Sequence, residues 1–498
     1  MHFVGDVFFA LFSRLTPKVA STLLFIILMR QAGSLTAGAY SLSIAFLTSG
    51  VLFSSLGLEE LIVREVAKEP SLSRRYLVNM LFLRGFLSLA GYGVVAGIVT
   101  LIPKYSPEVR HIILIQSLGL LPEGLNTTMF AVFNANRKLN WMAFVSVCVS
   151  AFQLIVGGAA LWMGADLVLL IWILLSGSLL GVIISAYLST KLLASQVAPS
   201  IGGAADLEQP HRWQLDWVFC RQQLKRTLPF ALIIGLVSLD LQLDVILLSV
   251  LGDVTEVGIY SAARTVVLLL SLLPQAFRMS IYPSMARAYA TSETELRKIY
   301  RQSWRYLSLA GLPLAVGTMI VSGQIVSLVY VDVPVTAAWS LSILTLHLLV
   351  GFLYIPGTRL MVVSNHQIRL SLLLGLSLGL NLLTNVFLVP RLGAVGTAIS
   401  RTGSSLLYFL SVELFVCRSV LPQHNGFRMA LKPAFSATAM AVAIWSLRTQ
   451  SLPITIPFGV VTYGMATVIL GTVTSSEREA VKAVLHHWLS QVVVRLRP

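Results

Sequence analysis

The stretch WMAFVSVCVSAFQLIVGGAALWM, residues 141–163, is followed after three residues by LVLLIWILLSGSLLGVIISAYLST, residues 167–190. Neither stretch contains Asp, Glu, Lys or Arg. A transmembrane helix needs about 20 mostly apolar residues, so each stretch is long enough to cross a bilayer. The two stretches therefore predict two consecutive membrane-spanning helices.

The rest of the chain has the same apolar character. Of its 498 residues, 56% are hydrophobic and 11% are charged, whereas a soluble chain has about 45–50% apolar and about 25% charged residues. The sequence therefore predicts an all-α polytopic membrane protein without a soluble domain. The first apolar stretch, 8–28, is too long for a signal peptide and is expected to remain as the first span. A window reading predicts about fourteen spans, with approximate limits 7–29, 37–63, 77–102, 111–135, 141–163, 167–190, 227–251, 255–283, 306–331, 336–358, 369–389, 393–417, 430–447 and 454–473.

The distribution of basic residues predicts the orientation of the chain in the membrane. With the N-terminus in the cytoplasm, roughly two dozen Lys and Arg residues fall on the inside and about five on the outside, a strong asymmetry by the positive-inside rule. Both termini are therefore expected in the cytoplasm, and the protein in the inner (cytoplasmic) membrane. The formal net charge of +15 is scattered over short loops, which favours contact with membrane lipids and argues against nucleic acid as a partner.

A short internal repeat predicts how the chain is divided. Gly38-Ala39-Tyr40-Ser41 opens the second span and Gly258-Ile259-Tyr260-Ser261 opens the eighth. The longest connection between spans contains Gly, Pro and mixed charges, as linkers do. Two parallel six-helix lobes follow from this arrangement. We predict an N-terminal lobe at 1–191, a cytoplasmic linker at 192–226, a C-terminal lobe at 227–417, a terminal helix pair at 418–474 and a cytoplasmic amphipathic tail at 475–498.

Basic residues inside the predicted spans are candidate contacts for an anionic substrate, because a charge within a span costs at least a few kcal/mol and is kept for function. Arg14 and Lys18 lie four residues apart and share one helical face, with Pro17 between them as a possible bend. A guanidinium matches phosphate oxygens with two donors at once. We predict a cationic cavity lined by Arg14, Lys18, Arg264 and Arg401. Three further arginines near span ends are expected to reach the interface: Arg84, Arg278 and Arg359.

Acidic residues inside the predicted spans are candidates for ion coupling: Asp240, Asp244, Glu123 and Glu413. A carboxylate near the middle of the bilayer could take up and release a proton near neutral pH, because desolvation disfavours its charged form. The coupling ion would be a proton or sodium. The alternative is structural, with Asp240 paired to Arg264 so that the seventh span is held to the eighth. Asn381 and Asn385 could bind substrate hydroxyls, but bonding to a neighbouring helix is favoured.

The sequence contains no motif for catalysis. It has no phosphate-binding glycine loop and no Cys or His pairs at metal-binding spacing, and its G-x-S-x-G match at 375–379 falls inside the apolar predicted span 369–389 and not at a turn. The three cysteines lie far apart and are expected to be packing residues. We therefore expect no enzyme activity, no metal and no cofactor, and transport driven by an ion gradient.

Several runs of the chain resemble one transporter family. Arg30-Gln-Ala-Gly-Ser-Leu-Thr-Ala-Gly-Ala-Tyr-Ser41, followed by Gly57-Leu-Glu-Glu-Leu-Ile-Val-Arg-Glu65, resembles the first two spans of bacterial polysaccharide-repeat flippases. The resemblance continues in Pro229-Phe-Ala, Gly258-Ile-Tyr-Ser-Ala-Ala-Arg264, Pro274, Tyr282-Pro283-Ser and Leu388-Val-Pro-Arg-Leu-Gly-Ala-Val-Gly-Thr-Ala-Ile-Ser400. The chain is identified as a member of the oligosaccharide flippase branch of the multidrug/oligosaccharidyl-lipid/polysaccharide exporter superfamily.

This resemblance implies a MATE-like fold of two lobes around a cavity that opens alternately to each side. Its members move undecaprenyl-pyrophosphate-linked oligosaccharides to the outer leaflet for cell-surface polysaccharide synthesis. The four basic residues named above would then contact the pyrophosphate, and Asp240 or Asp244 would sense the ion gradient. Two alternatives within transport are a lipid II flippase, whose substrate shares the pyrophosphate, and a MATE-type multidrug/ion antiporter. A membrane glycosyltransferase or polymerase would need a longer outside loop than any present.

Overall fold

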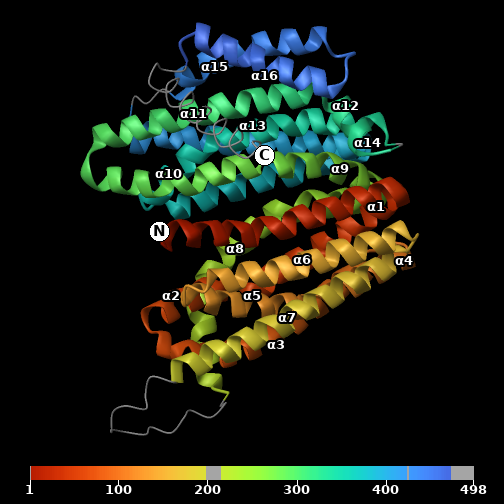
Figure 1. The fold of residues 1–498 in the computed structure, drawn as a ribbon, viewed down its shortest axis with the longest axis vertical. Helices are drawn as coiled ribbons and strands as arrows, with labels where there is room; N and C mark the ends of the chain where they lie inside the picture. Colours follow the sequence, from red (N-terminus) through yellow and green to blue (C-terminus); the bar gives the residue numbers. More distant parts are fainter. Residues whose placement is uncertain (1, 198–214, 332, 423–425, 473–498) are drawn as a thin grey trace, which may run out of the picture. The chain divides into compact units, whose positions relative to one another are not determined.

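The computed structural model describes residues 2–197, 215–331, 333–422 and 426–472, and the regular secondary structure of these residues is helical (Figure 1). The expected all-α fold is therefore confirmed. The α-helices are α1 His2–Ser55, α2 Leu58–Lys68, α3 Ser73–Leu101, α4 Pro107–Ser117, α5 Leu120–Ala135, α6 Leu139–Trp162, α7 Leu167–Val197, α8 Trp217–Leu251, α9 Val254–Leu270, α10 Leu272–Thr291, α11 Glu293–Ile320, α12 Ser322–Val329, α13 Val335–Val363, α14 Gln367–Phe415, α15 Gly426–Ser446 and α16 Leu452–Ile469.

The two apolar stretches 141–163 and 167–190 form the packed pair α6 and α7. Gly164 in the turn has a φ of 81°, a left-handed conformation that glycine adopts without a steric penalty. The Oδ1 atom of Asp166 accepts the amide hydrogen of Leu169 at 3.0 Å, which satisfies a free donor in the first turn of α7. Local sequence alone thus explains this helical hairpin.

Glycine kinks join neighbouring predicted spans into single long helices. Gly33 in α1 is non-helical, with φ 75° and ψ −175°. Gly393 in α14 is also non-helical, with φ 52° and ψ −127°. Each kink lies at the boundary between two predicted spans, so α1 and α14 each correspond to two of them. Pro17, the possible bend named from the sequence, lies inside α1, where Gly33 is the residue with non-helical backbone angles.

Other predicted spans are divided by the structure. The stretch 111–135 falls on α4 and α5, and 306–331 falls on α11 and α12, which are bent by 71° at their break. Within the described part of the chain, eight helices are long and apolar enough to cross a membrane, or nine when the bent α11–α12 pair is one span. The protein is polytopic, and the number fourteen stays a prediction.

The predicted linker 192–226 is helical at both ends, because α7 continues to Val197 and α8 begins at Trp217. Asp216 caps α8, since its carboxylate accepts the amide hydrogen of Phe219 and an Nη2 hydrogen of Arg75, each at 2.8 Å. These two donors hold the pKa of the Asp216 carboxyl below its usual range. Residues 198–214 and the predicted tail 475–498 lie outside the described residues.

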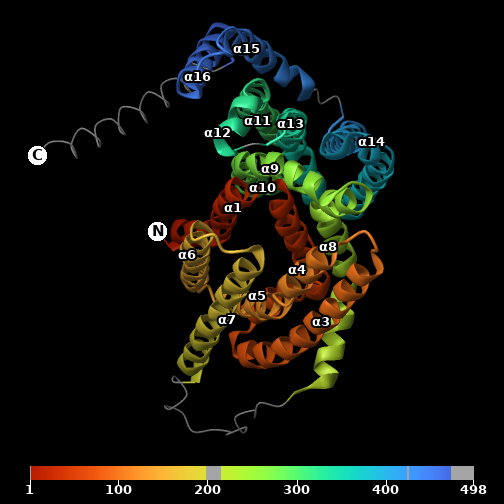
Figure 2. The ribbon, with the colours of Figure 1, turned by 90° about the vertical axis from the view of Figure 1, so that its right-hand side faces the viewer.

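The chain forms two compact units. The first comprises Met1–Thr265, Val329–Ala337 and Leu374–Arg401, and the second comprises Val266–Leu328, Ala338–Leu373 and Thr402–Pro498. In the first unit, α1 packs against α3, α4, α6 and α8, and Figure 2 shows α3 to α7 as one group coloured orange to yellow. In the second unit, α11 packs against α10 and α15, and α15 packs against α16. These compact units have other boundaries than the lobes predicted from the repeat. The two six-helix lobes stay a prediction.

The two repeated motifs meet in the first unit. A Cβ atom on Gly38 of α1 would overlap the carbonyl oxygen of Val254, and a Cβ atom on Gly258 of α9 would overlap the carbonyl oxygen of Ser34. Val254 lies four residues before Gly258, and Ser34 lies four residues before Gly38. The two overlaps therefore describe one symmetrical contact between α1 and α9. The repeat thus marks the point where two helix backbones touch, which only glycine permits.

Candidate functional site

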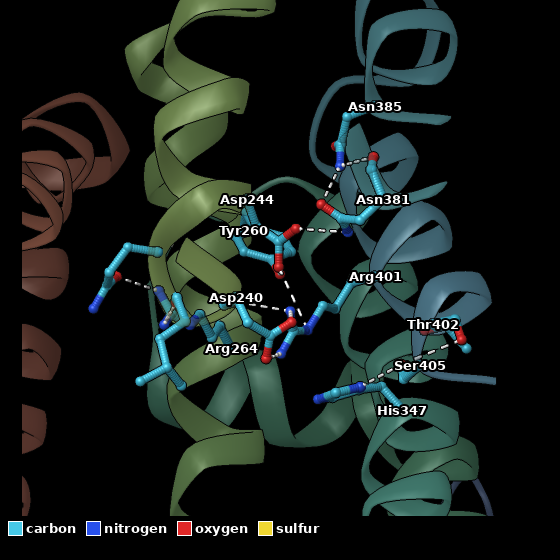
Figure 3. A network of polar contacts seen from close by, with 12 residues as sticks. Asp240, Asp244, Tyr260, Arg264, His347, Asn381, Asn385, Arg401, Thr402 and Ser405 are labelled. Carbon is cyan, nitrogen blue, oxygen red and sulfur yellow. Dashed lines mark hydrogen bonds and ion pairs between the residues drawn. The ribbon is translucent and has the colours of Figure 1, made fainter. Parts of the chain in front are cut away.

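Three helices bring polar side chains together inside the first unit (Figure 3). α8 contributes two aspartates one turn apart, α9 contributes a tyrosine and an arginine one turn apart, and the two halves of α14 contribute two asparagines and an arginine. We name this group the central cluster, and its members are Asp240, Asp244, Tyr260, Arg264, Asn381, Asn385 and Arg401.

Arg401 is held by both aspartates of α8. Its Nη1 donates to Asp240 Oδ1 at 2.8 Å, its Nη2 donates to Asp240 Oδ2 at 3.0 Å, and Nη1 also donates to the Asp240 carbonyl oxygen at 2.7 Å. The Nε atom lies 3.6 Å from Asp244 Oδ2. The Arg401 side chain is only 14% exposed and that of Asp240 25%. This two-pronged pair is therefore shielded from solvent, where such bonds are strong and directional.

Asp244 is the most enclosed acidic group of the central cluster. Its carboxylate is buried, accepts the Tyr260 hydroxyl at 3.1 Å and accepts the Asn381 Nδ2 amide at 3.0 Å. Asn385 in turn donates through Nδ2 to the Asn381 side-chain oxygen at 3.1 Å. The favoured interpretation of Asn381, bonding to a neighbouring helix, is confirmed. Asp244 thus ties α8 to both α9 and α14.

Arg264 has a different environment from Arg401. Its Nη2 donates to the Leu241 carbonyl oxygen at 2.6 Å, and its Nη1 donates to Gln242 Oε1 at 3.4 Å. Both acceptors are neutral. The hypothesis that Asp240 pairs with Arg264 is therefore wrong, because the second half of α14 places Arg401 against Asp240 instead. Sequence spacing could not reveal this partner.

The other predicted site residues lie on separate elements. Lys18 is on α1 with an exposed side chain, and for Arg14 only the backbone in α1 is described. Glu123 is half-buried in the first turn of α5. Glu413 is buried in the second unit, where its carboxylate accepts the Tyr300 hydroxyl at 3.0 and 3.1 Å. The structure thus brings together four of the eight predicted residues: Asp240, Asp244, Arg264 and Arg401.

Two residues were missed as site residues by sequence reasoning. Tyr260 belongs to the repeated motif, and that repeat is the signal that could have singled it out. Arg84 was expected to snorkel to the interface, but this expectation is wrong, since its side chain is 1% exposed. Its Nη2 donates to the Val51 carbonyl oxygen at 3.2 Å and lies 3.7 Å from Glu59 Oε1. α3 begins at Ser73, about three turns before Arg84, so Arg84 is not near a helix end and its side chain packs against Gly124 of α5.

A family model described as "Polysaccharide biosynthesis protein" matches residues 3–289. The chain belongs to this polysaccharide biosynthesis family. A relative within reach of sequence comparison is the probable flippase AglR of Haloferax volcanii, which is 29% identical over 258 residues. That match covers 49% of this chain and 52% of the relative, so the chain matches about half the length of that protein.

Solved structures extend the comparison of this polysaccharide biosynthesis family member to the whole fold. Lipid II flippase MurJ in an inward closed conformation aligns with a TM-score of 0.71 at 14% identity, covering 93% of this chain and 98% of that one. An inward-facing multidrug resistance MATE family transporter of the MOP superfamily aligns with a TM-score of 0.63 at 13% identity, covering 82% and 98%. The expected MATE-like fold is confirmed.

Proposed function

We propose that this protein is a flippase that carries an undecaprenyl-pyrophosphate-linked oligosaccharide across the cytoplasmic membrane, by alternating access, with both termini in the cytoplasm. Membership of the polysaccharide biosynthesis family and the MurJ-like fold support a lipid-linked substrate. The central cluster is the observation that carries the proposal. Charged residues from three helices are costly inside a membrane protein and are kept to move a charged substrate or ion.

Arg264 is the arginine of the central cluster that we assign to the pyrophosphate. Its hydrogen bonds end on the Leu241 carbonyl oxygen and on Gln242, so neither neutralises its charge. A guanidinium with neutral partners can exchange them for phosphate oxygens with a gain in electrostatic energy. Lys18 and Arg14, one turn apart on α1, would add positive charge.

Arg401 and the two aspartates form the coupling element of the proposed cycle. In the structure the Asp240 carboxylate accepts hydrogen bonds from both Nη atoms of the Arg401 guanidinium. Binding of a proton or a sodium ion to Asp240 or Asp244 would remove part of the Coulomb attraction that holds Arg401. The guanidinium would then be available to the pyrophosphate. Asn385 Oδ1, a buried oxygen with no hydrogen-bond partner among the described residues, would offer a further ligand to sodium, which prefers oxygen.

The pyrophosphate assignment predicts a slow Arg264→Ala protein. A hydrogen bond to a charged group contributes about 1.5–3 kcal/mol, so flipping should slow about tenfold or more. The measurement is the flipping rate of a lipid-pyrophosphate oligosaccharide in proteoliposomes. Lys18→Ala should slow it to a smaller extent, and Arg278→Ala, which removes an exposed cation of α10, is the matched control. A wild-type rate for a correctly inserted Arg264→Ala protein would refute the assignment.

The coupling assignment predicts that Asp244→Asn flattens the dependence of flipping on the ion gradient. The amide keeps the shape of the carboxylate and can still bond Tyr260 and Asn381, but it cannot take up a proton or balance a sodium charge. Flipping should be measured in proteoliposomes with an imposed proton gradient and, separately, an imposed sodium gradient. Dependence on either gradient equal to that of the wild type would remove Asp244 from coupling. Asp240→Asn, Glu123→Gln and Glu413→Gln test the remaining carboxylates in the same assay.

A lipid II flippase is the second candidate, because its substrate carries the same lipid pyrophosphate and MurJ shares the fold. Reconstituted protein offered lipid II and a lipid-pyrophosphate oligosaccharide in separate vesicles distinguishes the two by their flipping rates. A MATE-type antiporter for cationic drugs fits the central cluster less well, since the two aspartates that would attract a cationic drug are already engaged, Asp240 by Arg401 and Asp244 by Tyr260 and Asn381.

A further inference from the structure

The joint between α1 and α2 is a strained turn in the first unit. α1 ends at Ser55 and α2 begins at Leu58. Leu56 has a φ of 45° and Gly57 a φ of 78°, so two consecutive residues are left-handed. Glycine adopts this conformation freely, but a leucine there costs free energy and persists only when its surroundings hold it in place. Something packed against the joint must therefore hold it.

Arg84 of α3 touches both sides of this joint. Its Nη2 donates to the Val51 carbonyl oxygen near the end of α1, at 3.2 Å. The same nitrogen lies 3.7 Å from Oε1 of Glu59, which is in the first turn of α2. A cation is favourable near the C-terminal end of a helix and a carboxylate near the N-terminal end. Arg84 and Glu59 thus complement the two helix ends and attract each other across the turn.

The surroundings of Arg84 are built around it. A Cβ atom on Gly124 of α5 would lie 2.5 Å from the Ser88 hydroxyl oxygen and 2.9 Å from the Arg84 Nε atom, so the glycine leaves space for both side chains. Arg84 is buried, yet its Nε and Nη1 atoms have no hydrogen-bond partner among the described residues. Buried donors without partners are destabilising. An arginine kept at such a site for stability alone is unfavourable, which argues for a role in transport.

Glu59 connects the joint to a cavity of about 480 Å³. The cavity is lined by residues of α1, α2, α5 and α6, and those of α2 are Glu59, Glu60, Val63 and Arg64. One helix therefore carries both the partner of Arg84 and most of one wall of the cavity. A change in the angle of α2 at Leu56–Gly57 would move that wall.

We propose that Arg84 is a positioning residue for transport, a latch that holds α2 against the end of α1 through Glu59 and Val51 and so sets the opening of this cavity. The proposal rests on the proposed function for its role in the transport cycle. Release of the Arg84–Glu59 contact lets the Leu56–Gly57 joint relax, and α2 carries the cavity wall with it. The latch is separate from the central cluster, because α2, α3 and α5 contribute no residue to that cluster.

The test measures cavity opening and transport in the same proteins. The three native cysteines, Cys148, Cys220 and Cys417, are first replaced by alanine. Val63→Cys then places a single cysteine in the cavity wall, and its rate of reaction with a maleimide reports how open the cavity is. We expect Arg84→Gln and Glu59→Gln each to change this rate several-fold and to slow flipping of a lipid-pyrophosphate oligosaccharide in proteoliposomes. Arg84→Lys, which keeps the charge, should recover part of both.

Gly124→Ala is a second test, because the added methyl group crowds the Arg84 guanidinium and the neighbouring Ser88 hydroxyl without changing any charge. It should reproduce the effects of Arg84→Gln, whereas Gly93→Ala on α3, whose Cβ would meet no atom within 4 Å, should change neither readout. Unchanged labelling in folded Glu59→Gln and Gly124→Ala proteins overturns the latch, and so does slower transport without a change in labelling. If the wild-type protein flips no lipid-pyrophosphate oligosaccharide, the proposed function fails, while labelling still decides whether the latch exists.

Discussion

Arg401→Gln is expected to lower the free energy of unfolding by about 3 kcal/mol or more and to abolish transport. The substitution leaves Asp240 and Asp244 without the guanidinium that bonds the first and lies 3.6 Å from the second. Two carboxylates one turn apart then repel each other where water is scarce. Denaturant unfolding of the purified protein in detergent micelles measures the loss, and the proteoliposome assay measures flipping.

The control for this prediction separates an unpaired charge from lost packing. In the double variant Asp240→Asn/Arg401→Gln the main ion pair is removed from both sides, so a substantial part of the lost stability should return. Arg278→Gln, at an exposed arginine, should leave stability within about 0.5 kcal/mol of the wild type. Equal losses in the single and double variants would mean that the ion pair does not hold α8 to α14.

Gly38→Ala and Gly258→Ala are each expected to destabilise the protein by about 3 kcal/mol, at the upper end of the range for overpacking. The reason is that the added methyl group would overlap a backbone oxygen, of Val254 or of Ser34, and a helix backbone cannot move aside as a side chain can. α1 and α9 would have to separate. Thermal unfolding of the detergent-solubilised variants measures the effect.

The matched controls are Gly97→Ala in α3 and Gly379→Ala in α14, where an added Cβ would meet no atom within 4 Å. These should be neutral or slightly stabilising, because alanine is favoured over glycine inside a helix by about 0.5–1 kcal/mol. A wild-type unfolding temperature for Gly38→Ala or for Gly258→Ala would show that the backbones of α1 and α9 do not touch at these glycines.

Sequence patterns located most helices because the signal is local. Apolar stretches of about 20 residues define spans. The predicted stretch 141–163 agrees closely with α6, and the predicted stretch 167–190 begins where α7 begins, although α7 continues to Val197. The sequence predicts the breaks between helices less well. Gly33 and Gly393 produce kinks without ending the helix. The first turns of α8 are polar and therefore resemble a linker in sequence, although Asp216 caps a helix there. Helix ends depend on single bonds that an average over a window does not detect.

The sequence by itself determined that the chain is a polytopic helical membrane protein, that Asp240 and Asp244 share one face of a helix, and that a glycine motif occurs twice. These properties follow from composition and from the helical period, which act over a few turns. Only the tertiary structure decided that Asp240 pairs with Arg401, 161 residues away, and that Arg84 is buried against the α1–α2 joint. Side-chain pairing depends on how distant helices pack, because a hydrogen bond needs its two atoms within about 3 Å and an ion pair within about 4 Å, whatever the separation along the chain.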